Sequence, residues 1–287
     1  MPPEWVARPI KRPPGADLAL AIDQQLYPAL LPLVQRFARD NGIRVALQEG
    51  TCGVAAGALA DKSADITGMC CPPGPLDRMP GVRYHTIGIA AIALIVHPSN
   101  GVADVSLDQA RRMFGGEVRS WSDLPVSGFK PAPAGEVRAV TRLHCKPRPG
   151  HWRLLLDNEN LFAADALDVP AIRDMIAHVS ASPAAIGYET LWHVADNAKV
   201  GQVKTLRLDG VLPGDGTALA QGRYPLYRVM NVTTWGGAGS APMAGKLVAY
   251  LLEHAADIDP VYGIVPAVAL RRNGWQFAGD ELVGQPK

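Results

Sequence analysis

The chain has 287 residues with a formal net charge of +1, and 48% of its residues are hydrophobic. This length allows a substantial core and is typical of two domains of ordinary size. The near-neutral charge, without a basic run interleaved with aromatic residues, argues against a nucleic-acid-binding protein. No stretch approaches about 20 consecutive apolar residues, so we expect no membrane-spanning helix.

The N-terminal segment 1–15 contains charges and prolines but no apolar core of the kind that a signal peptide has. We expect it to form an extended arm. Two interpretations of the localisation stay open. The protein is either periplasmic, with its signal peptide already removed, or cytoplasmic.

The hydrophobic pattern predicts strands that alternate with helices. An apolar strand over 18–22 precedes a helix over 28–40, in which apolar residues recur at helical spacing and which Asn41-Gly42 ends. Strands over 43–47 and 65–69 flank a short helix. The apolar run within 83–97 is too short for a membrane and predicts a fully buried strand.

The same pattern continues to the end of the chain. Ser106 and Gln109 form a capping box at the start of a helix. After residue 240 we expect one amphipathic helix to 252 and then a loop-rich tail. Further strands are expected over 137–142, 185–188, 203–208 and 224–233, with helices from 151 and from 168 to about 179. This alternation is typical of α/β domains with parallel sheets, where ligands bind beyond the carboxyl ends of the strands.

All four cysteines lie in turns bounded by glycine or proline. Cys52, Cys70 and Cys71 belong to the stretch 50–74, GTCGVAAGALADKSADITGMCCPPG, and Cys145 lies in the later turn LHCKPRPG. Four cysteines are too few for a disulfide framework in a chain of this length, and no C-x-x-C pair is present. Since each turn follows a predicted strand, we expect the cysteines to converge near Asp23 in one cleft.

Several phrases in a fixed order resemble the periplasmic phosphate-binding proteins of ABC transporters, which belong to the type II solute-binding superfamily. The resemblance covers about residues 17–268. The phrases are IDQQLYPALLPLVQRF, GTCGVAAGALADKSADITGMCCPP, IAAIALIVHPSNGVADVSLDQARRMFGGEVRSWSDL, SPAAIGYETL, GRYPLYRVM and YGIVP.

The resemblance implies an α/β protein with the two-lobed type II periplasmic binding protein fold, hinge strands and an interlobe ligand cleft. Lobe one would comprise residues 1–96 and 201–287, and lobe two residues 97–200. It also implies a monomeric receptor that performs no chemistry on its ligand and is read by an ABC permease or by a sensor or redox partner.

The sequence departs from the family pattern at the ligand positions. Thr51-Cys52-Gly53 replaces a turn similar to Gly-Ser-Gly, and Cys70-Cys71 replaces a small and a polar residue. A turn that runs from His144 through Cys145 to His151 replaces a Ser-Gly-Thr turn. Arg142 matches a family arginine that approaches the bound oxyanion. The ligand-binding residues expected from this comparison are Asp23, Gln24, Thr51, Cys52, Gly53, Arg142, His144 and His151.

Converging thiolates suit a soft ion better than phosphate. The first hypothesis is therefore a thiophilic metal ion, metalloid or metal cluster held by Cys52, Cys70, Cys71 and Cys145. One alternative is phosphate or another oxyanion, bound by backbone N–H groups and Arg142. Another is an iron–sulfur redox protein built on the same cysteines.

Other interpretations of these side chains have less support. The cysteines also allow space-filling thiols or disulfides, and Cys145 with His151 allows a nucleophile and base. Asp23 serves equally well as a helix cap. We expect the remaining histidines to be structural: His85, His97, His178, His193 and His254.

Overall fold

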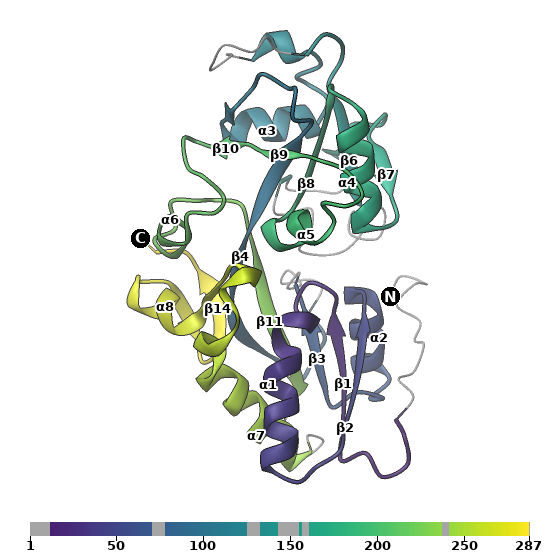
Figure 1. Ribbon diagram of the computed structural model, residues 1–287. Coiled ribbons are helices and arrows are strands. Elements are labelled where there is room, and N and C mark those ends of the chain that lie inside the picture. Colours follow the sequence, from purple (N-terminus) through teal and green to yellow (C-terminus); the bar gives the residue numbers. More distant parts are fainter. Residues whose placement is uncertain are drawn as a thin grey trace. The chain divides into compact units, whose positions relative to one another are not determined.

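The computed structural model describes residues 12–70, 78–124, 133–142, 155–156, 161–236 and 241–286. Strands and helices alternate along these residues, and the main sheet contains both parallel and antiparallel neighbours (Figure 1). The predicted α/β class is confirmed. The internal contacts of the chain divide it into two compact units, one of Met1–Ile89 with Val229–Lys287 and one of Ala90–Arg228.

The first unit is built on three parallel strands, β1 (Leu18–Asp23), β2 (Val45–Gly50) and β3 (Ile66–Met69). β1 lies between the other two, and all of its residues are buried. A continuous apolar run of this kind is typical of a strand that is covered on both faces. Strand β11 (Tyr227–Trp235) pairs antiparallel with β3, so the sheet is mixed rather than purely parallel.

Helix α1 (Tyr27–Asp40) confirms the helix predicted over 28–40. Pro28 lies in its first turn, where a missing N–H costs no hydrogen bond. Gly42 follows the helix with a φ of 63°, which glycine adopts without steric penalty. Helix α1 packs against α7 (Pro242–Glu253). Its buried side chains recur three or four residues apart and form one apolar face: Ala29, Leu30, Leu33, Val34 and Phe37.

Strand β4 (Val82–Val96) is buried from Thr86 to Val96, which confirms the predicted buried strand. Gly88 is required in this strand, because an added Cβ atom would lie 2.2 Å from the carbonyl oxygen of Val265. Both β4 and β11 contain residues of the two units, so the chain passes from one unit to the other along these strands.

The boundaries of the two units differ from those expected for the lobes, which were 96 and 201. Residues 201–228 belong to the second unit. They do so because β9 (Lys204–Thr205) pairs with Ile95 and Val96 of β4, and β10 (Arg207–Leu208) pairs with β5 (Asp104–Val105). The functional lobe boundaries stay a prediction.

The second unit contains a sheet in which β8 (Ala185–Thr190) lies between β4 and β6 (Arg138–Arg142), with β7 (Leu167–Val169) beyond β6. β6 is parallel to β8 and to β7, whereas β4 is antiparallel to β8. Trp121 is fully buried, and its ring N–H donates to the carbonyl oxygen of Ala184 at 2.9 Å. The helical elements of this unit are α3 (Leu107–Phe114), η2 (Trp121–Asp123), α4 (Ile172–Ala181), α5 (Leu191–Asp196) and α6 (Gly216–Ala220).

Helix α3 starts where the sequence predicted. The side chain of Ser106 accepts the N–H of Gln109 at 3.0 Å, and the Gln109 side chain accepts the N–H of Ser106 at 2.8 Å. The capping box therefore provides acceptors for two N–H groups that the helix itself leaves without partners.

The C-terminal segment is more ordered than the expected loop-rich tail. The elements after α7 are η6 (Ala255–Asp257), η7 (Pro260–Tyr262), β12 (Ile264–Pro266), α8 (Ala267–Arg272), β13 (Gln276–Ala278) and β14 (Glu281–Gly284). Each is at most six residues long, which is too short to show a hydrophobic period. No helix within the described ranges combines the length and apolarity needed to cross a bilayer.

Candidate functional site

The carboxyl ends of the parallel strands in the first unit bring several expected ligand residues together. β1 ends at Asp23, which lies opposite Gly50 at the end of β2. β3 ends at Met69, directly before Cys70. Ligands bind beyond such strand ends in open α/β sheets. Gln24, Thr51, Cys52 and Gly53 follow the same ends, so they lie where a ligand is expected, and their role in binding stays a prediction.

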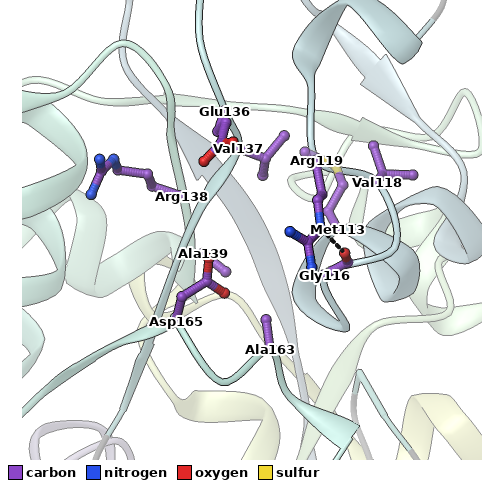
Figure 2. A pocket seen from close by; sticks show the side chains of 10 residues that line it. All are labelled: Met113, Gly116, Val118, Arg119, Glu136, Val137, Arg138, Ala139, Ala163 and Asp165. Atoms are coloured by element: carbon purple, nitrogen blue, oxygen red, sulfur yellow. Dashed lines mark hydrogen bonds between the residues drawn. The ribbon is translucent and has the colours of Figure 1, made fainter.

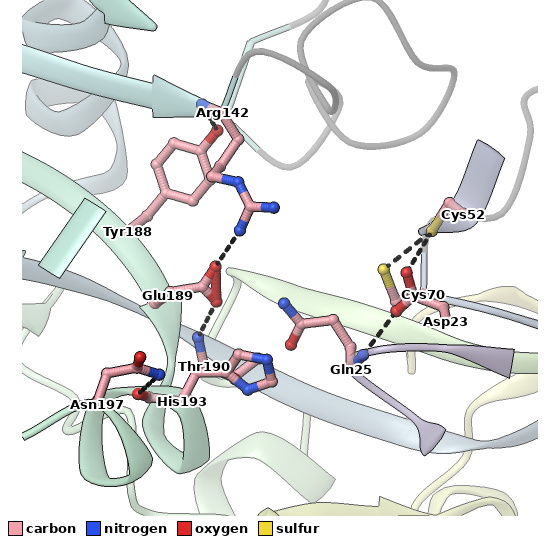
Figure 3. A network of polar contacts seen from close by, with 10 residues as sticks. All are labelled: Asp23, Gln25, Cys52, Cys70, Arg142, Tyr188, Glu189, Thr190, His193 and Asn197. Atoms are coloured by element: carbon pink, nitrogen blue, oxygen red, sulfur yellow. Dashed lines mark hydrogen bonds and ion pairs between the residues drawn. The ribbon is translucent and has the colours of Figure 1, made fainter. Parts of the chain in front are cut away.

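Cys52 contacts both Asp23 and Cys70 (Figure 3). The Sγ of Cys52 donates to Oδ2 of Asp23 at 3.1 Å and lies 3.3 Å from the Sγ of Cys70. Asp23 and Cys70 are buried, whereas Cys52 is partly exposed. The sulfur–sulfur distance exceeds the roughly 2.05 Å of a disulfide bond. The structure therefore holds Cys52 and Cys70 as two neighbouring thiols.

The backbone turns around this cluster are fixed by hydrogen bonds. Oδ1 of Asp23 accepts the N–H of Gln25 at 2.8 Å, and the N–H of Gln24 donates to the carbonyl oxygen of Gly50 at 2.8 Å. Thr51 caps helix α2 (Cys52–Ala60), because its Oγ1 accepts the N–H of Val54 at 3.3 Å. Asp23 thus orients its own turn and also accepts a hydrogen bond from the thiol of Cys52.

Four of the expected site residues, Cys71, His144, Cys145 and His151, lie outside the described residues. The structure brings two of the four cysteines together. Convergence of all four, and the pairing of Cys145 with His151, stay predictions.

In the second unit, Arg142 ends strand β6 and is 3% exposed. Its Nη1 lies 3.4 Å from Oε1 of Glu189, and its backbone N–H donates to the hydroxyl of Tyr188 at 3.4 Å (Figure 3). Its Nε has no hydrogen-bond partner among the residues that the structure describes. A buried donor without an acceptor costs about 1–3 kcal/mol, and more in a charged group. Arg142 therefore presents a donor suited to an anion.

Glu189 is fully buried one residue before the end of β8. Its Oε2 accepts the N–H of Thr190 at 3.1 Å, at the start of helix α5. Carrying a carboxylate into the interior is costly unless a cation and hydrogen-bond donors compensate. Arg142 and the Thr190 N–H supply this compensation, so Glu189 positions the guanidinium of Arg142 and partly neutralises it.

His193 is buried on α5, with its Nδ1 lacking a hydrogen-bond partner within the described part of the chain. Burial lowers the pKa of His193 below its ordinary value of 6.5; Glu189 opposes the shift, and Arg228 adds to it. The imidazole is therefore held neutral at pH 7.

This shift predicts how stability depends on pH. Since the pKa of His193 is lower in the folded chain than in the unfolded chain, the unfolded chain takes up more protons as the pH falls below 6.5. We expect the melting temperature to fall more steeply from about pH 7.5 to about pH 5.5 in the wild type than in His193→Gln. Differential scanning calorimetry measures this slope. His178→Gln, at an exposed position of α4, should keep the wild-type slope. Equal slopes in the wild type and His193→Gln would contradict the expectation.

Glu189, His193 and Arg228 are buried polar residues that the sequence analysis did not assign to the site. His193 was expected to be structural, and nothing in the sequence pairs it with Arg142. One signal was available: Arg228 interrupts the strand predicted over 224–233, and Glu189 directly follows the strand predicted over 185–188. A charged residue in a buried strand is usually paired or functional.

A separate pocket in the second unit lies at the start of β6 (Figure 2). Arg138, Arg119, Glu136 and Asp165 contribute charged side chains to its lining. Arg142 is the last residue of the same strand, about 13 Å away at roughly 3.3 Å per residue. The pocket therefore lies at the end of the strand opposite to the end where open α/β sheets bind ligands.

Known proteins resemble this chain in sequence and in fold. The family model described as the PBP superfamily domain matches residues 10–254. The phosphate-binding protein PstS of Bacillus subtilis (strain 168) is 22% identical over 234 residues, which cover 78% of this chain and 72% of that protein.

Two solved structures show the same fold at low identity. One is a putative phosphate ABC transporter substrate-binding protein with bound phosphate from Clostridium perfringens, with a TM-score of 0.71, 16% identity, and coverage of 87% of this chain and 99% of that chain. The other is an ABC-type phosphate transport receptor from Vibrio cholerae, with a TM-score of 0.67, 17% identity, and coverage of 86% and 99%. The chain belongs to the PBP superfamily, as a solute-binding protein of the type II, phosphate-binding-protein-like family.

Proposed function

We propose that the protein is an extracytoplasmic receptor that binds phosphate and delivers it to an ABC permease, without catalysing a reaction. The relatives described above are named as phosphate-binding proteins or phosphate transport receptors, which supports this ligand and this partner. The observation that carries the proposal is the buried guanidinium of Arg142 at the end of β6, with one N–H lacking an acceptor among the described residues.

Arg142 has the geometry and charge to bind an oxyanion. A guanidinium presents parallel N–H donors that match two oxygens of a phosphate, and it stays protonated when buried. Glu189 holds Nη1 at 3.4 Å, which fixes the orientation of the guanidinium plane before the ligand arrives. A donor group positioned in advance loses less entropy on binding.

Glu189 also favours an anion that still carries a proton. An ionised carboxylate only accepts hydrogen bonds, so a fully deprotonated anion beside it is repelled. Phosphate carries a proton at pH 7 and can donate it in a hydrogen bond, whereas sulfate carries none. We therefore propose that the site selects phosphate over sulfate.

The comparisons favour the oxyanion alternative over the first hypothesis drawn from the cysteines. That hypothesis was a thiophilic metal, metalloid or metal cluster as cargo, with an iron–sulfur redox protein as another possibility. The three relatives described above are named for phosphate, and none of their names mentions a metal or an iron–sulfur cluster. The oxyanion alternative has the better support.

A thermal-shift comparison of two anions tests the proposal. Both phosphate and sulfate stabilise folded proteins by exclusion from the surface, so sulfate is the matched control. We expect phosphate to raise the melting temperature as a ligand that binds only the folded chain does, with an increase that depends on the phosphate concentration relative to its Kd. At equal ionic strength, the increase should be larger with phosphate than with sulfate. Equal, non-saturating shifts with the two anions would contradict phosphate binding.

A further inference from the structure

We propose that Asp23, Cys52 and Cys70 of the first unit bind a single thiophilic or borderline metal ion such as Zn²⁺. This proposal does not depend on the phosphate-binding function proposed for Arg142, which belongs to the second unit. It uses three side chains rather than the four cysteines expected from the sequence. All three side chains belong to one unit, on the ends of β1 and β3 and the start of α2.

The three ligand atoms are close enough for one ion. One oxygen or sulfur from each residue lies within 4.8 Å of the other two. The Cys52 sulfur is 3.1 Å from Oδ2 of Asp23 and 3.3 Å from the sulfur of Cys70. In a tetrahedral zinc site with Zn–S near 2.3 Å and Zn–O near 2.0 Å, neighbouring ligand atoms are about 3.5–3.8 Å apart. The two distances from the Cys52 sulfur would therefore have to lengthen by about half an ångström to match those of a zinc site.

The chemistry of the donor set favours a soft or borderline ion. Two thiolates select Zn²⁺, Cd²⁺ or Cu⁺ over Mg²⁺ and Ca²⁺, which prefer oxygen ligands. Binding replaces the two thiol protons, which leave as two H⁺ while two metal–sulfur bonds form. Three protein ligands leave the fourth tetrahedral position to water or another donor.

The surroundings hold the ligands in place. Asp23 is oriented by the Gln25 N–H, which binds Oδ1 and leaves Oδ2 directed at Cys52. Such hydrogen bonds to a ligating carboxylate strengthen metal sites. Asp23 and Cys70 are buried, whereas Cys52 is partly exposed, so an ion would enter from the side of Cys52.

Cobalt titration of the reduced, metal-free full-length protein tests this site. Co²⁺ substitutes for Zn²⁺ and gives a thiolate-to-metal charge-transfer band in the near ultraviolet. We expect a band that saturates at one ion per chain and is abolished in Cys52→Ser and in Cys70→Ser. Asp23→Asn should weaken binding by at least the roughly 10–100-fold that loss of an outer-shell partner costs.

The Cys71→Ser/Cys145→Ser double variant is the matched control, because it removes two cysteines and keeps all three proposed ligands. It should retain the band. Loss of the band in this variant, its persistence in Cys52→Ser, or its absence from fully reduced wild-type protein would each overturn the proposal.

A second measurement on the unaltered protein guards against variants that fail to fold. Zn²⁺ should protect Cys52 and Cys70 from alkylation by iodoacetamide, as read by peptide mass spectrometry. Equal alkylation of both residues with and without Zn²⁺ would overturn the metal site. Phosphate binding is measured separately on metal-free protein, so failure of one proposal is distinguishable from failure of the other.

Discussion

Replacing Arg142 by alanine should weaken phosphate binding by roughly 30-fold or more. The substitution removes the guanidinium that would pair with the bound phosphate. Loss of one partner of such a buried, hydrogen-bonded charge pair typically costs about 2–5 kcal/mol of binding free energy. Each 1.4 kcal/mol corresponds to about a tenfold change in affinity. The substitution also removes the cation that Oε1 of Glu189 contacts, so the negative charge of this carboxylate is compensated less and repels the anion more. Isothermal titration calorimetry of the folded variant with phosphate measures the loss.

Arg138→Ala is the matched control for this experiment. Arg138 begins the strand that Arg142 ends, is exposed, and lines the separate pocket. Its removal lowers the net charge of the protein by the same amount as Arg142→Ala. We expect Arg138→Ala to bind phosphate as the wild type does. Equal losses in the two variants would mean that general electrostatics, rather than a site at Arg142, governs binding.

The second large effect concerns stability. Arg142 and Glu189 are 3% and 0% exposed in their side chains, and breaking a buried ion pair by removing one partner costs about 3–5 kcal/mol. We expect Arg142→Met and Glu189→Met each to lower the free energy of unfolding by this amount. The double variant should lose far less than the sum, because both members of the pair are replaced together by apolar side chains.

The wild type, the two single variants and the double variant form a double-mutant cycle. Urea denaturation of these four proteins measures the interaction energy between Arg142 and Glu189. Strictly additive losses would show that the two side chains do not interact. The double variant should still fail to bind phosphate, which separates the contribution of Arg142 to stability from its contribution to binding.

Much of the fold was predictable because its core elements are long and strongly patterned. Helix α1 has apolar residues on one face and ends at a glycine, and β4 is a continuous apolar run. The short elements after α7 escaped prediction because none is long enough to repeat a hydrophobic period. The assignment of residues 201–228 depends on strand pairings with β4 and β5, which local sequence does not encode.

The candidate site was only partly predictable. Asp23, Cys52 and Cys70 meet because they follow the ends of parallel strands and the start of the next helix, which the pattern indicated. The ion pair of Arg142 with Glu189 was not foreseen, since it depends on the lateral pairing of β6 with β8. The lowered pKa of His193 likewise results from its burial near charged side chains, which its place in the sequence does not reveal.

Phosphate is the proposed ligand, and its binding can be measured directly. Equilibrium dialysis of the reduced, metal-free wild-type protein against radiolabelled phosphate tests it most directly. We expect saturable binding of one phosphate per chain, undiminished by an excess of sulfate. Binding that fails to saturate, or that sulfate displaces as readily as unlabelled phosphate does, would contradict it.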